Sequence, residues 1–381
     1  MEKGPVAREC SCSCNGDPQN SENRCCKPMP PAHAGENRTP WVIGAIETST
    51  GKIPQVSTEY TPRDRFGAWK ARWGIGRMDY KVPPGLYGVG NPDANSLVLV
   101  SANYKMSFDR LRSELKGLDL WILVLDTRGV NVWCAAGKGT FGTEELVHRI
   151  SQVRLPEIVT HRALIVPQLG APGVSAHKVL KLSGFRVLYG PVRAADVPAF
   201  IGRGLKATAA MREVRFDMRD RLVLAPFELV STVKPALLLL AVLFLVNLIA
   251  GKEGFALSLV SHTLADFIPY LGAVLTGTVL TPLLLPYIPG PAFAWKGWLM
   301  GLLWAGVYVW FIASQASWTH GLFYLLILPP IASYLAMNFT GCSTYTSLSG
   351  VAKEMKFAVP AQLISAVGGI ILWVGGLLLG F

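Results

Sequence analysis

The last third of this 381-residue sequence has very little charge. From Pro235 to Phe381 there are four lysines, three acidic residues and no arginine, although the whole chain has 36 basic and 25 acidic residues. Soluble domains usually carry charge on about a quarter of their residues. The lack of charge therefore argues against a soluble domain here, and the chain divides near residue 230 into a charged part and an apolar part.

The apolar part contains five hydrophobic stretches, at residues 235–250, 264–285, 293–315, 318–337 and 358–380. Most approach the length of about 20 residues that crosses a bilayer as a helix. Each stretch alone also fits a buried helix of a soluble protein, but five in succession argue against that interpretation. We expect residues 226–381 to form an all-α membrane domain of five transmembrane helices.

The basic residues near these stretches favour one orientation. With five crossings, only Lys252 falls on one side of the membrane. Six basic residues fall on the other side: Arg219, Arg221, Lys234, Lys296, Lys353 and Lys356. Positive charge is retained on the cytoplasmic side, and the N-terminus shows no charged-then-apolar signal segment. This predicts a multi-pass protein of the cell (inner) membrane with its N-terminal part in the cytoplasm. Asp266, beside His262, is expected near a helix end that water can reach.

The first 40 residues lack apolar periodicity and hold five of the seven cysteines, at positions 10, 12, 14, 25 and 26. Such a segment buries too little surface to fold alone, so residues 1–40 are expected to be a disordered tail. The cysteine spacing matches neither paired zinc motifs nor the usual iron–sulfur runs. Capture of a soft metal stays open, and disulfides are disfavoured by the cytoplasmic placement.

The middle region, residues 41–225, alternates two patterns. Short apolar runs lie at residues 97–100, 120–125, 163–166 and 185–188, and helical patterns lie at 108–116, 143–153 and 174–182. Continuous apolar runs are typical of strands buried on both faces, and their alternation with helices predicts βαβ units and a parallel sheet. We expect an α/β Rossmann-like domain.

The predicted strands end in small and polar residues. These ends are residues 101–103, 126–129 and 167–173, and the second continues into the segment around Cys134. Ligands of such sheets bind beyond the carboxyl ends of the strands. The three ends should line one site, with Ser101 and Asn103 as candidate binding residues.

Nucleotide motifs are incomplete in this region. Residues 137–142 fit G-x-G-x-x-G, with Glu157 downstream, yet about ten residues separate the strand from Gly137. The dinucleotide fingerprint needs its glycines in the turn itself, and Lys138 is followed by glycine where a phosphate-binding loop has Ser or Thr. The positive charge also lacks a nucleic-acid recognition module, so no nucleic-acid partner is expected.

Cys134 is the only cysteine of the middle region. If Asn131 caps a short helix, Cys134 falls in its first turn, where the helix dipole and nearby Lys138 favour a thiolate. Trp133 is expected to anchor the helix by burying a large apolar surface. Small residues surround the sulfur and leave room for a flat, wide ligand: Ala135, Ala136, Gly137 and Gly139.

Two other interpretations of Cys134 remain open. A lone cysteine is commonly a small buried core residue. It is also a possible catalytic nucleophile, because His148 and His161 lie downstream, although sequence spacing does not place either histidine beside the sulfur.

The run from Asn131 to Lys138, with residues 121–127 and 101–109, closely resembles the mercury-methylating corrinoid proteins of anaerobic microbes. The resemblance covers residues 41–381, including five membrane spans, and does not cover the cysteine-rich tail. Residues 72–90, rich in glycine, proline and basic residues, also resemble this family and suit either a loop around the corrin or a plain turn.

The resemblance implies a domain similar to the corrinoid domain of the corrinoid iron–sulfur protein of the acetyl-CoA pathway. It implies a cobalamin-type corrinoid with Cys134 as the lower axial cobalt ligand. The cap helix beneath the ring would comprise Asn131, Val132, Trp133, Ala135, Ala136, Gly137 and Lys138. Ser101 and Ser107 would hydrogen-bond the sulfur or the corrin, or serve only as caps.

The activity implied by the resemblance is transfer of a methyl group from methyl-Co(III) to Hg(II), which makes methylmercury. A thiolate donates electron density to its metal, which suits this transfer. Implied partners are a ferredoxin-like protein with two [4Fe–4S] clusters and a methyltetrahydrofolate-dependent methyl donor. The basic residues would bind anionic lipid or steer an acidic ferredoxin. Two alternatives stay open: a membrane-bound corrinoid methyl carrier of one-carbon metabolism, and a non-catalytic membrane scaffold or transporter with a ligand sensor.

Overall fold

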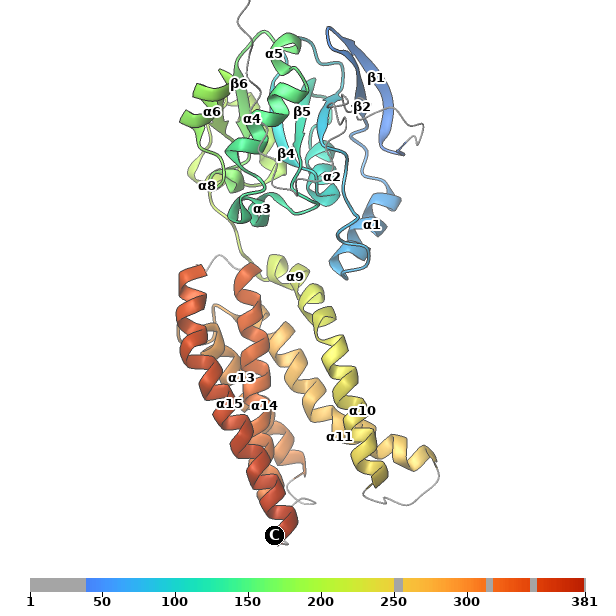
Figure 1. The fold of residues 1–381 in the computed structure, drawn as a ribbon, viewed down its shortest axis with the longest axis vertical. Coiled ribbons are helices and arrows are strands. Elements are labelled where there is room, and N and C mark those ends of the chain that lie inside the picture. Colours follow the sequence, from blue (N-terminus) through green and yellow to red (C-terminus); the bar gives the residue numbers. More distant parts are fainter. Residues whose placement is uncertain (1–38, 250–255, 313–317, 343–347, 380–381) are drawn as a thin grey trace, which may run out of the picture. The chain divides into compact units, whose positions relative to one another are not determined.

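The computed structural model describes residues 39–249, 256–312, 318–342 and 348–379 (Figure 1). Residues 1–38 of the predicted tail, with its five cysteines, and Lys252 lie outside the described residues. The described chain comprises a mixed α/β domain and, after it, a helical region, as the charge distribution predicts.

Seven strands form one mixed sheet in the order β1-β2-β3-β5-β4-β6-β7. Neighbouring strands pair in parallel except β1 with β2 and β3 with β5, which are antiparallel. The strands are β1 (Val42–Thr48), β2 (Gly51–Val56), β3 (Gly85–Val89), β4 (Val98–Ala102), β5 (Leu120–Leu125), β6 (Ala163–Val166) and β7 (Arg186–Tyr189).

The four apolar runs of the sequence correspond to β4, β5, β6 and β7, which are mutually parallel. The expectation of an all-parallel sheet was wrong, because β1, β2 and β3 extend the sheet and two of the pairings are antiparallel. Residues 72–90 are not one loop, since they contain β3. Gly88 of β3 is explained by close packing, because a Cβ at this position would lie 2.2 Å from Cδ1 of Ile46.

The three expected helices appear as α2 (Lys105–Ser113), α4 (Thr143–Gln152) and α6 (Ala176–Ser183). The domain also has α1 (Pro62–Arg72), α3 (Val132–Lys138), α5 (Leu155–Ile158), α7 (Val197–Gly202), α8 (Ala209–Arg212) and the 3₁₀ turns η1 (Gln168–Gly170) and η2 (Ala194–Asp196).

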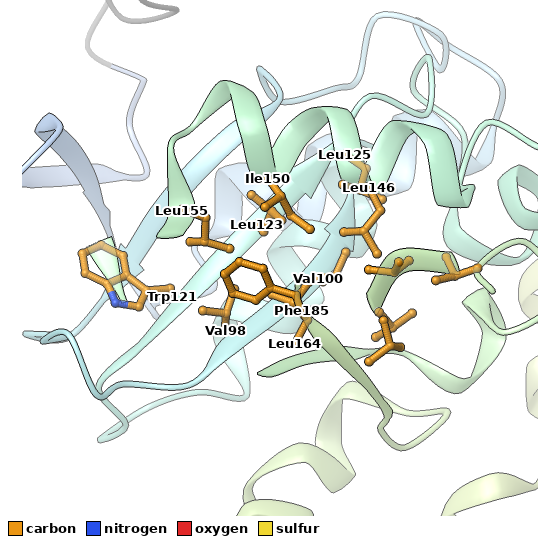
Figure 2. Close-up of a cluster of buried hydrophobic side chains, with 14 of the residues drawn as sticks. Val98, Val100, Trp121, Leu123, Leu125, Leu146, Ile150, Leu155, Leu164 and Phe185 are labelled. Carbon is orange, nitrogen blue, oxygen red and sulfur yellow. The ribbon is translucent and has the colours of Figure 1, made fainter. Parts of the chain in front are cut away.

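The core lies on both faces of the sheet. Trp121, Leu123 and Leu125 of β5 pack on one face against Leu146 and Ile150 of α4 (Figure 2). The alternate residues of β5, Ile122 and Val124, join a second cluster with Phe108 of α2. Successive side chains of a strand point to opposite faces, which explains why β5 is apolar throughout. The two covered faces leave the strand ends as the open part of the domain.

The helical region contains α9 (Met218–Ser231), α10 (Val233–Ile249), α11 (Ala256–Leu275), the π-helical turn η3 (Thr276–Leu280), α12 (Thr281–Leu284), α13 (Phe293–Ile312), α14 (Trp318–Asn338), η4 (Phe339–Cys342) and α15 (Leu348–Leu379). Within the described residues, three helical segments are long and apolar enough to cross a membrane: 257–284, 318–338 and 349–376. Helices α9 and α10, bent by 46° at their junction, make a fourth if they count as one span. The five predicted spans therefore reduce to three or four here.

Asp266 does not lie near a helix end. The helical segment runs from Leu257 to Leu284, because the helix begins before the apolar stretch from which its start was predicted. Asn247 of α10, itself buried, donates its side-chain N–H to Oδ2 of Asp266 at 2.9 Å. The acid thus belongs to a polar contact between α10 and α11, which corrects its predicted position.

Candidate functional site

Helix α3 presents Cys134 on its open side. The side chain of Asn131 accepts a hydrogen bond of 2.9 Å from the backbone N–H of Cys134, as a helix N-cap does. The helix ends at Gly139, whose φ of 80° is the left-handed conformation that favours glycine. Ala135 and Ala136 are buried against the domain, and the free thiol of Cys134 is exposed. The cap was predicted by the sequence, and the exposed thiol excludes the interpretation as a buried core cysteine.

Asn103 holds the loop between β5 and α3. Its Nδ2 donates to Oδ1 of Asp126 at 3.0 Å, while its Oδ1 accepts from the backbone N–H groups of Thr127 at 3.1 Å and Gly129 at 2.9 Å. The side chain is buried. These bonds join the ends of β4 and β5 and fix the start of α3. Asn103 is thus a positioning residue in this structure, and its direct contact with a cofactor stays a prediction.

A cavity of about 310 Å³ lies beside the N-terminal end of α3. Its walls come from the ends of β4, β6 and β7 and from the first residues of α3: Ser101, Asn131, Val132, Trp133, Pro167, Leu169 and Gly190 among others. The cavity also includes Ser107 of α2. Of the three strand ends that the sequence predicts to line one site, two contribute to this cavity, through Ser101 and through Pro167 and Leu169. Residues 126–129 do not line it, and the segment that follows them joins the wall only from Asn131 on.

Trp133 differs from its expected role. It keeps 36% of its surface exposed and forms part of the cavity wall, so it does not anchor α3 by full burial. The buried alanines on the other side of α3 do that instead. The large indole surface is consequently available to a ligand.

Gly137 has no role that the protein itself explains. A Cβ built at this position meets no atom within 4 Å, and its φ is not in the left-handed region. A glycine inside a helix costs about 1 kcal/mol relative to alanine. Cys134, Gly137 and Lys138 are all exposed. The space beside them is therefore open on the side from which a broad ligand would approach.

His161 is not a partner of Cys134. Its Nε2 lies 2.9 Å from the carbonyl oxygen of Ser96. Ser96 precedes β4 and so lies at the amino end of that strand, whereas α3 follows the carboxyl end of β5. Among the described residues no group of three His, Cys, Asp or Glu side chains is arranged to hold a metal ion. The contact of His161 argues against it as a base for Cys134, whereas the alternative with His148, exposed on α4, stays a prediction.

A buried ion-pair network lies next to this site and was not predicted from the sequence. Lys105 lies 3.0 Å from Asp64 and 2.5 Å from Asp109, and Arg112 binds the same two carboxylates at 2.8 and 2.9 Å. Burial alone would raise the pKa of Asp64, but hydrogen bonds from Lys105 and Thr61 and the charge of Lys105 lower it to about 2. The spacing of Asp109 and its partners on α2 is a signal for part of the network, but no pattern in the sequence links it to Asp64.

Comparison with known proteins gives one region of similarity. Residues 76–201 match the CO dehydrogenase/acetyl-CoA synthase delta subunit family. Three relatives are gamma subunits of the acetyl-CoA decarbonylase/synthase complex. That of Methanopyrus kandleri is 32% identical over 127 residues, 33% of this chain and 27% of the relative. The Archaeoglobus fulgidus subunit is 28% identical over 127 residues, which are 33% of this chain and 27% of the relative. The Methanocaldococcus jannaschii subunit is 33% identical over 97 residues, which are 25% of this chain and 20% of the relative.

The region of similarity holds the candidate site. It extends from before β3 to α7 and includes α3, Asn103 and the cavity residues. The chain spans about a quarter of the length of these curated relatives. The helical region lies outside the matched residues, so this α/β domain is homologous to part of a subunit of a multi-subunit complex.

Proposed function

We propose that the α/β domain binds a cobalamin-type corrinoid, whose cobalt the Cys134 thiolate would ligate, and transfers a methyl group to Hg(II). The observation that carries this proposal is the exposed thiol of Cys134 beside Gly137, where a side chain would meet only open space. The similarity to acetyl-CoA decarbonylase/synthase gamma subunits supports a corrinoid cofactor. Strands β4 to β7 with their helices form the Rossmann-like part that would hold it.

The residues present fit such a group. Cys134 would supply a soft thiolate ligand for a transition metal, and Gly137 leaves open space near it. Asn131 fixes the first turn of the helix, so the sulfur is held at a defined place before any ligand binds. Ser101, Trp133 and the other cavity residues would receive a part of the ligand that extends below the ring.

When bound, the corrinoid supplies a cobalt-held methyl group that can leave as a carbanion equivalent. Cys134 would donate electron density to the metal, because a thiolate is a strong electron donor. Hg(II), the substrate, is a soft electrophile that accepts the methyl group with its electron pair. The protein's contribution would be to hold the turn that carries the sulfur in place and to leave the thiol exposed.

The second candidate is a corrinoid methyl carrier that delivers the methyl group to an acceptor of one-carbon metabolism. The observation that favours it is the identity of the relatives, which are subunits of an acetyl-CoA decarbonylase/synthase complex. Both candidates use the same site and differ only in the acceptor.

A single-turnover assay separates the two. The full-length protein, loaded with a methylated corrinoid without oxygen, is mixed with Hg(II), and methylmercury is measured against time. We expect stoichiometric methylmercury from the wild type and none from Cys134→Ala. If the methyl group stays on the cobalt with Hg(II) but leaves rapidly to a thiol or nickel acceptor, the carrier is the correct function.

The proposed reaction also needs an electron donor, a methyl donor and a place in the cell. Reduction of the cobalt would need a ferredoxin-like protein with two [4Fe–4S] clusters, since the described residues offer no ligand group for a cluster. A methyltetrahydrofolate-dependent system would restore the methyl group. The helical region, with three or four segments able to cross a membrane, would anchor the α/β domain on the cytoplasmic side, and five spans stay a prediction.

A further inference from the structure

Helix α1 and the turn after it expose a group of large apolar side chains. Phe66 is 60% exposed, Trp69 50%, Ile75 53% and Met78 60%, and Ile43 of β1 is 64% exposed. The rings of Phe66 and Trp69 stack at 5.9 Å. We call these five residues the α1 patch. Contiguous exposed apolar side chains on a soluble domain usually mark a binding surface.

The α1 patch surrounds a depression. A cavity of about 530 Å³ is lined by Ile43, Phe66 and Ile75 of the patch. Its floor is the buried ion-pair network, in which Asp64 binds Lys105 and Arg112. A floor held by paired charges keeps its shape without a ligand. A concave, rigid apolar site suits an inserted side chain of a protein better than it suits the flat surface of a bilayer.

The surroundings of the patch are basic. Residues 62–81 contain six Lys and Arg residues but only two acidic residues, and one of these, Asp64, is buried and paired. Arg63 and Lys70 line the cavity, but so do Glu59 and Asp79, and the basic excess therefore belongs to α1 and the turn after it and not to the cavity wall. A partner that docks here should therefore carry an acidic surface around an apolar side chain.

The patch adjoins the loop that positions Cys134. A Cβ at Gly129 would lie 3.0 Å from the carbonyl oxygen of Met78, and Gly129 is held by Asn103 at the start of the loop to α3. A protein on the α1 patch would thus stand beside the candidate site. A partner that must bring a reactive group close to the bound cofactor gains from such a position, whereas a lipid surface does not.

We propose that the α1 patch is the docking surface for an acidic electron-donor protein that serves this site. The inference rests on the proposed function for the identity of the partner. Because the methyl group leaves with the bonding electron pair, the cobalt would remain Co(III) and would need two electrons to return to Co(I). Each of the donor's two clusters would give up one electron and be oxidised. Arg63 and Lys70 would attract the acidic surface, and Phe66 and Trp69 would supply the apolar contact.

The test uses the full-length protein in nanodiscs and, as the probe, an acidic ferredoxin with two [4Fe–4S] clusters. Its Kd is measured by biolayer interferometry at low and high salt for the wild type, Phe66→Ala/Trp69→Ala and Arg63→Glu/Lys70→Glu. We expect both variants to raise the Kd by about tenfold or more, and the wild-type Kd to rise with salt. Leu180→Ala/Leu182→Ala is the matched control, because these exposed apolar residues lie on α6.

Two results would overturn the inference: no binding of the ferredoxin to the wild type, or equal binding to all four proteins. Hydrogen exchange of residues 62–72 gives a second readout. Protection by anionic nanodiscs alone, unchanged by ferredoxin, would identify the patch as a lipid contact instead. Binding is measured without the corrinoid as well, so that failure of the wild type to bind a corrinoid contradicts the proposed function while the docking result still stands.

Discussion

Single residues of α3 divide into those that hold the helix and those that leave space. Asn131, Ala135, Ala136 and Gly139 are explained by the protein's own geometry, since they cap or bury the helix. Cys134 and Gly137 are not, because one exposes a thiol and the other omits a side chain that would meet nothing. Residues whose identity only a ligand explains are the sharpest indication of where the ligand lies.

Gly137→Ala separates stability from binding. Alanine is the better helix former, so we expect the free energy of unfolding to rise by about 0.5–1 kcal/mol. Corrinoid affinity should fall, because the added methyl group occupies the open space near Cys134. Chemical denaturation and spectroscopic titration with the corrinoid measure the two effects.

Gly139→Ala is the control for that variant. Its φ of 80° is unfavourable for alanine, so this change should lower stability by about 1 kcal/mol. A Gly137→Ala protein that binds the corrinoid like the wild type would contradict the placement of the ligand above α3.

Cys134→Ala should leave the fold intact. The side chain is exposed, and surface substitutions usually change stability within about 0.5 kcal/mol. The absorption spectrum of the bound corrinoid, recorded without oxygen, should lose the features of a cobalt–thiolate bond, and methylmercury formation should stop. An unchanged spectrum in this variant would mean that another group ligates the cobalt.

At the scale of elements, the buried side chain of Asn103 makes hydrogen bonds to the β5–α3 loop, with Asp126, Thr127 and Gly129. Asn103→Ala removes the acceptor of two backbone N–H groups, those of Thr127 and Gly129. An unsatisfied buried polar group costs about 1–3 kcal/mol, and we expect a loss of that order in the free energy of unfolding. Asn103→Asp keeps the acceptor but replaces the donor to Asp126 with a buried carboxylate beside it, so we expect its loss to be at least as large.

The ion-pair network makes the α1–α2 contact sensitive to acid. The pKa of Asp64 is about 2 in the folded protein against 3.8 for the free side chain. Its stabilising contribution is present above pH 4 and is lost as the pH falls from about 4 to 2, since the unfolded chain then binds the proton more readily. Denaturation of the wild type and Asp64→Asn across this pH range should converge at the acidic end. Curves that remain parallel would contradict this role.

The sequence predicted β4 to β7, α4 and α6, because continuous apolar runs and helical periodicity are local properties. It did not predict β3, whose glycines suggest a loop until the packing of Ile46 against Gly88 is known. The cap of Asn131 on Cys134 was readable because it spans three residues. The bonds of Asn103 and the pairing of Asp64 with Arg112 connect residues 23 or more apart, and no local pattern encodes them.

At the scale of the whole molecule, the helical region has its own polar connection. Asn247 donates to Asp266 between α10 and α11. Hydrogen bonds between membrane helices contribute on average about 0.6 kcal/mol and at most about 1.7 kcal/mol. Asn247→Ala should lower thermal stability in detergent by an amount in this range and leave corrinoid binding unchanged. Loss of the cofactor in this variant would mean that the two parts of the chain are energetically coupled.

The closure of α3 at both ends bears on the order of biogenesis. Asn131 and Gly139 terminate this helix with the protein's own groups, and the buried alanines fix it to the sheet. The turn that carries Cys134 is thus formed before any ligand binds. Binding would therefore not have to offset the conformational entropy lost when this turn is ordered. Under the proposed function, folding of this domain would therefore precede cofactor loading, and a pool of empty protein would act as a ready acceptor when corrinoid is scarce.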